Sequence, residues 1–112
     1  MKIVFTTKGS TWESKMDARF GRTEYFLIYD EEKDELLSYD NKDIDKIGHG
    51  AGPKTVQKLM EYQPNILITG NGPGEKAGLV LKNTNVDIYI GAGNMTAKEA
   101  YEAYKNNKLD KF

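Results

Sequence analysis

Short apolar segments alternate with polar, glycine-containing segments along the whole chain. The first apolar segment covers residues 2–7, and two further ones, at 24–30 and 35–40, are separated by the charged residues 31–34. A strand, a turn and a strand in this order predict an antiparallel hairpin. Large apolar side chains occupy alternate positions on both faces of residues 24–30, which is typical of a strand that is covered on both sides.

Residues 8–22 form a polar segment between the first strand and the hairpin. Trp12, Met16 and Phe20 are spaced through it. Leaving three large apolar side chains in water is costly. The segment is therefore predicted to be an ordered loop that packs on the core.

From residue 50 onward, predicted helices and strands alternate. Helices are expected at 50–62, directly after 70–73 and from Thr96, where Thr96 and Glu99 have the spacing of a capping box. On the second helix, Ala77, Val80 and Leu81 are expected to face inward. Strands are expected at 66–69 and 86–90. This alternation predicts a parallel α/β sheet, and a length of 112 residues fits a single domain covering residues 1–112.

A Gly-x-Gly pattern recurs three times, with its first glycine at Gly50, Gly70 and Gly91. Each copy is expected to open a helix. Because right-handed crossovers bring the C-terminal ends of parallel strands to one edge of a sheet, the second and third copies should lie side by side, and the first can join them. Glycine backbone and helix N-termini can hold an anion, although the glycines could equally serve only as tight turns. The candidate binding residues are Gly50, Gly52, Gly70, Asn71, Gly72, Gly91 and Gly93.

Two further side chains stand out as candidates for binding. His49 is the only histidine and precedes the first Gly-x-Gly copy. A neutral imidazole can bind a metal, act as a base or make a structural hydrogen bond. Arg19 and Arg22 could hold an anionic ligand as bidentate donors. The alternative for Arg19 is a surface ion pair with Asp17.

Composition argues against several classes of function. The chain has no cysteine, so it has no disulfide, no catalytic thiol and no thiolate-held iron–sulfur cluster. A net charge of −1 without a basic run argues against nucleic-acid binding. No segment approaches the ~18 apolar residues of a membrane span, and no signal peptide is recognisable. A cytoplasmic protein with no membrane partner is therefore expected.

The order of these motifs resembles that of the dinitrogenase iron–molybdenum cofactor biosynthesis family. That family includes small NifX-like and NafY-like carriers and the C-terminal part of NifB-like proteins. It implies an RNase H-like, three-layer α/β fold, in which helices cover both faces of a mixed five-stranded sheet with an antiparallel second strand. The resemblance runs from Lys2 to about Leu109 and is carried by Arg19-Phe20-Gly21-Arg22, Tyr29-Asp30, His49-Gly50-Ala51-Gly52 and Thr69-Gly70-Asn71-Gly72-Pro73.

The resemblance also implies a function. The protein would be a non-catalytic carrier of an anionic iron–sulfur or iron–molybdenum cluster or its precursor, bound transiently, with no permanent cofactor. Its partners would be cluster donor and acceptor proteins, and it would be a monomer or a weak homodimer. By position, His49 would be the ligand to the cluster metal, and Arg19 and the glycine loops would donate hydrogen bonds. The first strand contains no carboxylate, so nuclease activity is not expected.

Two other functions stay open from the residues alone. The same loops could bind a phosphate-containing or nucleotide ligand in a small-molecule binding protein or an enzyme. The chain could also be a regulatory interaction domain that binds no ligand.

Overall fold

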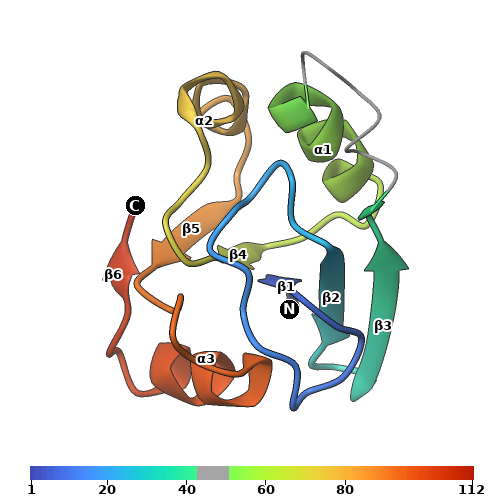
Figure 1. Cartoon of the computed structure of the whole chain (residues 1–112), viewed down its shortest axis with the longest axis vertical. Helices are drawn as coiled ribbons and strands as arrows, with labels where there is room; N and C mark the ends of the chain where they lie inside the picture. The colour runs from blue at the N-terminus through green and yellow to red at the C-terminus, as the bar shows by residue number, and fades with distance from the viewer. Residues whose placement is uncertain (43–50) are drawn as a thin grey trace.

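The computed structural model describes residues 1–42 and 51–112. Within them, six strands form one sheet in the order β3-β2-β1-β4-β5-β6, and three helices pack on it (Figure 1). The elements are β1 (Lys2–Thr7), β2 (Tyr25–Asp30), β3 (Glu35–Asp40), α1 (Ala51–Met60), β4 (Ile66–Ile68), α2 (Glu75–Leu81), β5 (Asp87–Ile90), α3 (Ala97–Lys105) and β6 (Asp110–Lys111).

The sheet is mixed. β1 pairs in parallel with β4, and β4 with β5. β2 runs antiparallel to its neighbours β1 and β3, so both the hairpin and the antiparallel second strand are confirmed.

The predicted count of five strands is wrong, because β6 adds a sixth strand antiparallel to β5. β6 has only two residues, both exposed, so it carries no alternating pattern that could have revealed it. Main-chain pairing holds it in place, and the Phe112 N–H continues the pairing with a 2.8 Å hydrogen bond to the Ile88 carbonyl.

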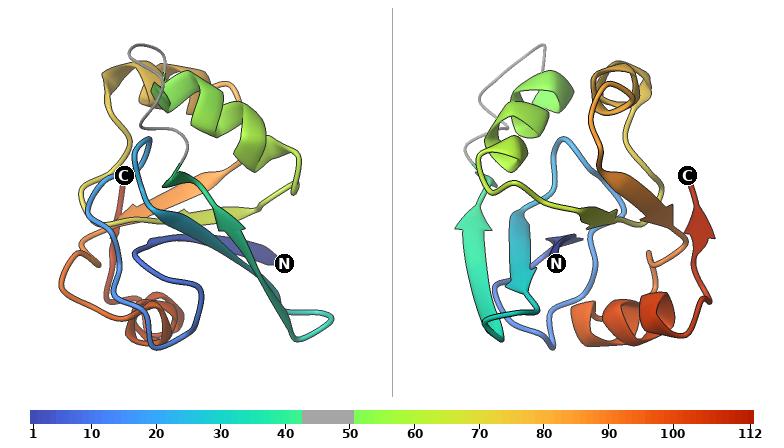
Figure 2. Two further views of the ribbon diagram at one scale, coloured as in Figure 1. Left: turned by 45° about the vertical axis from the view of Figure 1, so that its right-hand side comes forward. Right: turned by 180° about the vertical axis from the view of Figure 1, so that it is seen from behind.

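Helices cover both faces of the sheet, as predicted. α1 and α2 lie on one face and α3 on the other (Figures 1 and 2). In β1, Val4 belongs to the core on the α1–α2 side, whereas Ile3 and Phe5 belong to the core on the α3 side. This two-sided burial explains the continuous apolar run of β1.

The helices differ from the sequence predictions at their ends. α1 ends at Met60 rather than near residue 62, and Gln63 has a φ of 52° that no α-helix adopts. Residues 70–73 do not open α2 directly: its N-cap is Gly74. Val80 is 39% exposed rather than inward, because this seven-residue helix buries only the stripe that contains Ala77 and Leu81.

The capping box at the start of α3 is confirmed. The Thr96 hydroxyl accepts a 3.2 Å hydrogen bond from the Glu99 N–H, and the Glu99 carboxylate accepts one of 2.9 Å from the Thr96 N–H. The loop at residues 8–22 is ordered, as predicted: Met16 and Phe20 are buried. This loop is fastened to α3 by backbone hydrogen bonds from Ala97 and Lys98.

Candidate functional site

Three loops meet at one edge of the sheet, where β1, β4 and β5 end. The Gly91 N–H donates to the Gly70 carbonyl at 3.0 Å, and the Asn71 N–H donates to the Ala18 carbonyl at 3.1 Å. A Cβ placed on Gly70 would lie 2.6 Å from the Ala18 Cα and 3.2 Å from the Gly93 Cα. The predicted side-by-side placement of the second and third Gly-x-Gly copies is therefore confirmed, and the loop that carries Arg19 joins them.

The outer surface of this edge is made of backbone and small polar side chains. Asn71, Gly91, Gly93 and Asn94 are exposed. Within the part of the chain that the structure describes, the amide groups of Gly93 and Asn94 donate no hydrogen bond to the protein. They are consequently available as donors to a ligand that approaches from solvent.

Two of the glycines have backbone conformations that favour glycine. Gly72 has a φ of 91° and Gly91 a φ of 98°, a region that side chains with a Cβ rarely enter. These values turn the chain sharply after β4 and β5. The sequence pattern marked both positions, and the structure gives a reason for glycine that is independent of any ligand.

Arg19 is fixed at the rim of the edge by a buried carboxylate. Its Nε and Nη2 atoms donate to the two Asp17 carboxylate oxygens at 3.1 and 3.0 Å. The Asp17 side chain is only 2% exposed and that of Arg19 is 54% exposed, so the pair is half-buried rather than a surface pair. The Asp17 carboxylate also accepts hydrogen bonds from the N–H groups of Arg19 and Glu24.

These contacts determine the ionisation of Asp17. Burial raises the pKa of the carboxyl, but the hydrogen bonds from Arg19 and Glu24 and the charge of Arg19 lower it by more, so the pKa lies below its ordinary value. Asp17 is therefore a carboxylate at neutral pH and offsets part of the Arg19 charge.

A layer of buried hydroxyl groups supports the loops from below. The Thr6 hydroxyl lies 2.8 Å from the Thr69 hydroxyl and donates to the Asp17 carbonyl at 3.0 Å. This links the ends of β1 and β4 to the start of the Arg19 loop. Thr69 begins one of the motifs that carry the family resemblance, but neither threonine was predicted to have a role, and their positions near the ends of two predicted strands were the only further signal.

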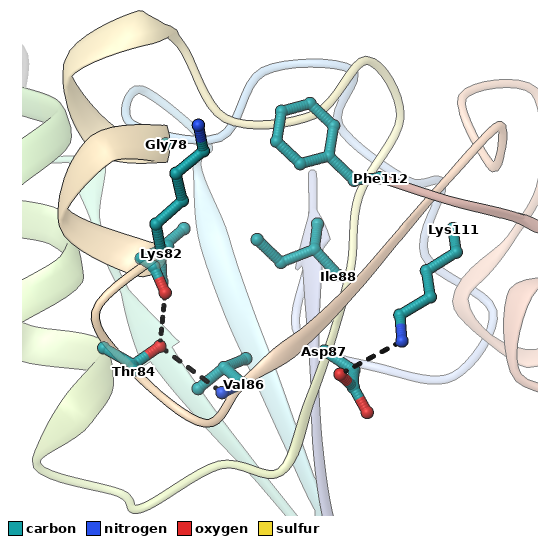
Figure 3. A pocket seen from close by; sticks show the side chains of 9 residues that line it. Gly78, Lys82, Thr84, Val86, Asp87, Ile88, Lys111 and Phe112 are labelled. Atoms are coloured by element: carbon teal, nitrogen blue, oxygen red, sulfur yellow. Dashed lines mark hydrogen bonds and ion pairs between the residues drawn. The ribbon is translucent and has the colours of Figure 1, made fainter.

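Phe112 contacts the second loop from the side. A Cβ on Gly72 would lie 3.0 Å from the Phe112 Cε1, so the ring occupies space that a side chain at Gly72 would need. The same ring lines a pocket of about 270 Å³ between α2 and the β5–β6 pair (Figure 3). Lys111 and Asp87, which also line this pocket, form a 3.4 Å ion pair. Nothing in the sequence pattern pointed to Phe112.

The remaining predicted binding residues near the first Gly-x-Gly copy are His49, Gly50 and Gly52. His49 and Gly50 lie outside the described residues, so the role of His49 as a metal ligand stays a prediction. Gly52 lies in the first turn of α1, and the place of the first Gly-x-Gly copy at the sheet edge is also untested.

Residues 1–42 and 51–112 contain no group of three or more His, Cys, Asp or Glu side chains that could hold a metal ion. Over the same residues, no helix has the length and apolar character that crossing a membrane requires.

Comparisons with known proteins agree with this architecture. A family model described as dinitrogenase iron-molybdenum cofactor matches residues 1–107. The apo form of the orange protein from Desulfovibrio gigas is 24% identical, with a TM-score of 0.92 over 99% of this chain and 92% of that one. A provisional NifB protein from Thermotoga is 33% identical, with a TM-score of 0.83 over 98% of this chain and 91% of that one. No curated protein matches the chain significantly.

Proposed function

The chain belongs to the dinitrogenase iron–molybdenum cofactor family, and from that premise we propose that it binds an anionic iron–sulfur or iron–molybdenum cluster, or a precursor, and passes it on unchanged. The cluster is cargo in this proposal, not a resident cofactor. The observation that carries the proposal is the meeting of three loops around Gly70, which leaves a surface of backbone and small residues at the sheet edge.

The chemistry of this edge suits an anion rich in sulfide. Backbone N–H groups such as those of Gly93 and Asn94, which donate to no acceptor within the described part of the protein, can donate to sulfides. The absence of side chains at the glycines lets a bulky cluster approach the backbone closely. Arg19 adds positive charge at the rim, moderated by Asp17.

The donor set also suits release of the cargo. The chain has no cysteine, so a cluster would be held by hydrogen bonds, by charge and by His49 rather than by thiolates. Such contacts break one at a time, and an acceptor protein that offers thiolates would withdraw the cluster. Loose binding is what a carrier requires.

The proposal includes several properties that follow from family membership rather than from the geometry. We take the protein to be a non-catalytic, cytoplasmic monomer or weak homodimer whose partners donate or accept the cluster. We also take the fold to be RNase H-like, which the strand order β3-β2-β1-β4-β5 with an antiparallel β2 supports.

An anaerobic titration tests the proposal. A reconstituted iron–sulfur or iron–molybdenum cluster is added to the full chain, and visible absorption is followed before and after removal of unbound cluster. We expect saturable retention by the wild type and weaker retention by His49→Ala. Equal retention by both proteins would remove His49 from the site, and no retention by either would overturn the proposal.

A further inference from the structure

A second hollow lies on the α3 face of the sheet, separate from the glycine loops. It has a volume of about 370 Å³ and is lined by Trp12, Glu13, Tyr29, Lys98, Tyr101 and Glu102. Three elements supply these side chains: the loop after β1, the sheet strand β2, and α3, which covers one face of the sheet and is hydrogen-bonded to that loop (Figure 1). Half of the lining residues are aromatic, and the other half are charged.

The three aromatic rings stand at steep angles to one another. The Trp12 and Tyr29 ring centroids are 5.1 Å apart with an interplanar angle of 72°, and those of Tyr29 and Tyr101 are 5.4 Å apart at 77°. Trp12 and Tyr101 are 5.7 Å apart at 46°. These separations and angles are those of rings packed edge to face or tilted against one another, and all three rings line the hollow, so it is bordered by the kind of aromatic surface that attracts a methylated ammonium group.

Carboxylates increase the electron density of two of these rings. The Tyr29 hydroxyl donates to Asp34 at 2.7 Å, and the Tyr101 hydroxyl donates to Glu31 at 2.6 Å. A phenol that donates to a carboxylate shifts electron density into its ring, and the negative face of the ring becomes more attractive to a cation. The hydrogen bond to Asp34 raises the pKa of Tyr29, and burial, together with the hydrogen bond to Glu31, raises the pKa of Tyr101.

The Tyr101 ring already attracts an ammonium group within the protein. The Lys105 Nζ lies 5.7 Å from the Tyr101 ring centroid and 2.9 Å from Glu31. Lys105 is not among the residues that line the hollow. Its ion pair with Glu31 holds the ammonium group beside the ring.

The charges at the rim favour a cation as well. Glu13 and Glu102 contribute two negative charges against the single positive charge of Lys98. We propose that the hollow binds a methylated ammonium group, carried either by a small molecule or by a methylated lysine side chain. Such a group is weakly hydrated, so the aromatic side chains that line the hollow can replace its water at little cost. This proposal is independent of the cluster-carrier function.

The only tryptophan of the chain lies in the hollow, so the fluorescence of Trp12 reports binding directly. We would titrate the full chain with choline and with its uncharged isostere, in which a tert-butyl group replaces the trimethylammonium group. Saturable change with choline and none with the isostere is the expected result. An equal response to both, or no response to choline, would overturn the proposal.

A second arm of the titration distinguishes the two sources of the cation. A short peptide that contains trimethyl-lysine is compared with the same peptide carrying unmodified lysine. Binding of the methylated peptide more tightly than choline would support a protein-borne group. Binding of choline as tightly as the methylated peptide, or more so, would support a free small molecule.

Substitutions at the rim give a directional test. Removing one contributing charge or one contributing ring is expected to change the affinity for choline about two- to fivefold. Glu102→Gln should weaken binding, and Lys98→Gln should strengthen it. Glu61→Gln, an exposed change beyond the end of α1, should leave the affinity unchanged. Opposite or absent effects at residues 98 and 102 would overturn the proposal.

The rings can be tested without removing the fluorophore. Tyr101→Phe keeps the ring and loses the hydrogen bond to Glu31, so it should bind choline more weakly than the wild type. Tyr101→Leu should bind least. Because Tyr101 also contacts the core residue Phe5, Tyr29→Leu provides a second variant should Tyr101→Leu fail to fold. Wild-type affinity for choline in a folded Leu variant at either position would contradict a role of the aromatic side chains in binding.

Discussion

Gly70 and Gly93 pack directly against each other, with 3.2 Å separating the Cα of Gly93 from the place a Gly70 Cβ would take. This contact brings the loop after β4 and the loop after β5 together. The loop that contains Ala18 presses on Gly70 from another side, at 2.6 Å. Gly70 is therefore a packing position, whereas Gly93 is exposed.

The two glycines should respond differently to the same substitution. Gly70→Ala forces the backbone at Ala18 to move and is expected to lower the free energy of unfolding by about 1–3 kcal/mol. Gly93→Ala places its Cβ 3.8 Å from the nearest atom, the Gly70 Cα, and should change stability by less than about 0.5 kcal/mol. Urea denaturation measures both values. Similar losses in the two variants would contradict the packing described.

Asp17→Asn should remove a pH-dependent part of the stability. The pKa of Asp17 is below its ordinary value of 3.8 in the folded protein, so its carboxylate stabilises the fold above that pH and the stabilisation disappears as the pH falls through the folded-state pKa. At neutral pH we expect the variant to be about 1–2 kcal/mol less stable than the wild type.

The pH dependence distinguishes lost charge from lost packing. Urea denaturation from pH ~7 down to pH ~2 should show the two proteins converging at the acidic end. A constant difference over the whole range would mean that the carboxylate charge is not what Asp17 contributes.

Thr96→Ala should weaken the start of α3. It removes the hydroxyl that accepts from the Glu99 N–H, and the loss of such a cap costs about 1 kcal/mol. Thr96→Ser keeps the hydroxyl and should retain most of the stability. Equal losses in the Ala and Ser variants, measured by thermal unfolding, would show that the capping box does not stabilise the helix.

Phe112 is predicted to restrain the loop after β4. Because its ring lies against Gly72 and lines the pocket beside α2, Phe112→Ala should accelerate amide hydrogen exchange at Asn71, Gly72 and Gly74. The effect on global stability should stay below about 1 kcal/mol, since the side chain is 56% exposed. Phe112→Leu, which keeps an apolar contact, serves as the control. Unchanged exchange in Phe112→Ala would contradict a restraining role.

The elements with strong local patterns were predictable from the sequence. The apolar run of β1, the β2–β3 hairpin and the Thr96–Glu99 capping box all rest on spacings within a few residues. The side-by-side placement of the second and third Gly-x-Gly copies was also predictable, because the handedness of crossovers places parallel strand ends at one edge.

The features that were missed depend on contacts between distant residues. β6 is too short to show a pattern and exists through its pairing with β5. The burial of Asp17 depends on donors from Arg19 and Glu24 that the fold brings around it. The short spacing between Asp17 and Arg19 in the sequence suggests an ion pair between them. It does not indicate that the Asp17 carboxylate is buried.

A negative charge introduced at position 93 provides the most direct test of cluster binding at the sheet edge. Gly93→Glu and Gly93→Gln differ only in charge, and the exposed, uncrowded position lets both side chains extend into solvent. In the anaerobic cluster titration, we predict that Gly93→Glu weakens retention of the anionic cluster about tenfold relative to Gly93→Gln. Equal retention by the two variants would contradict the claim that the glycine loops hold the cargo.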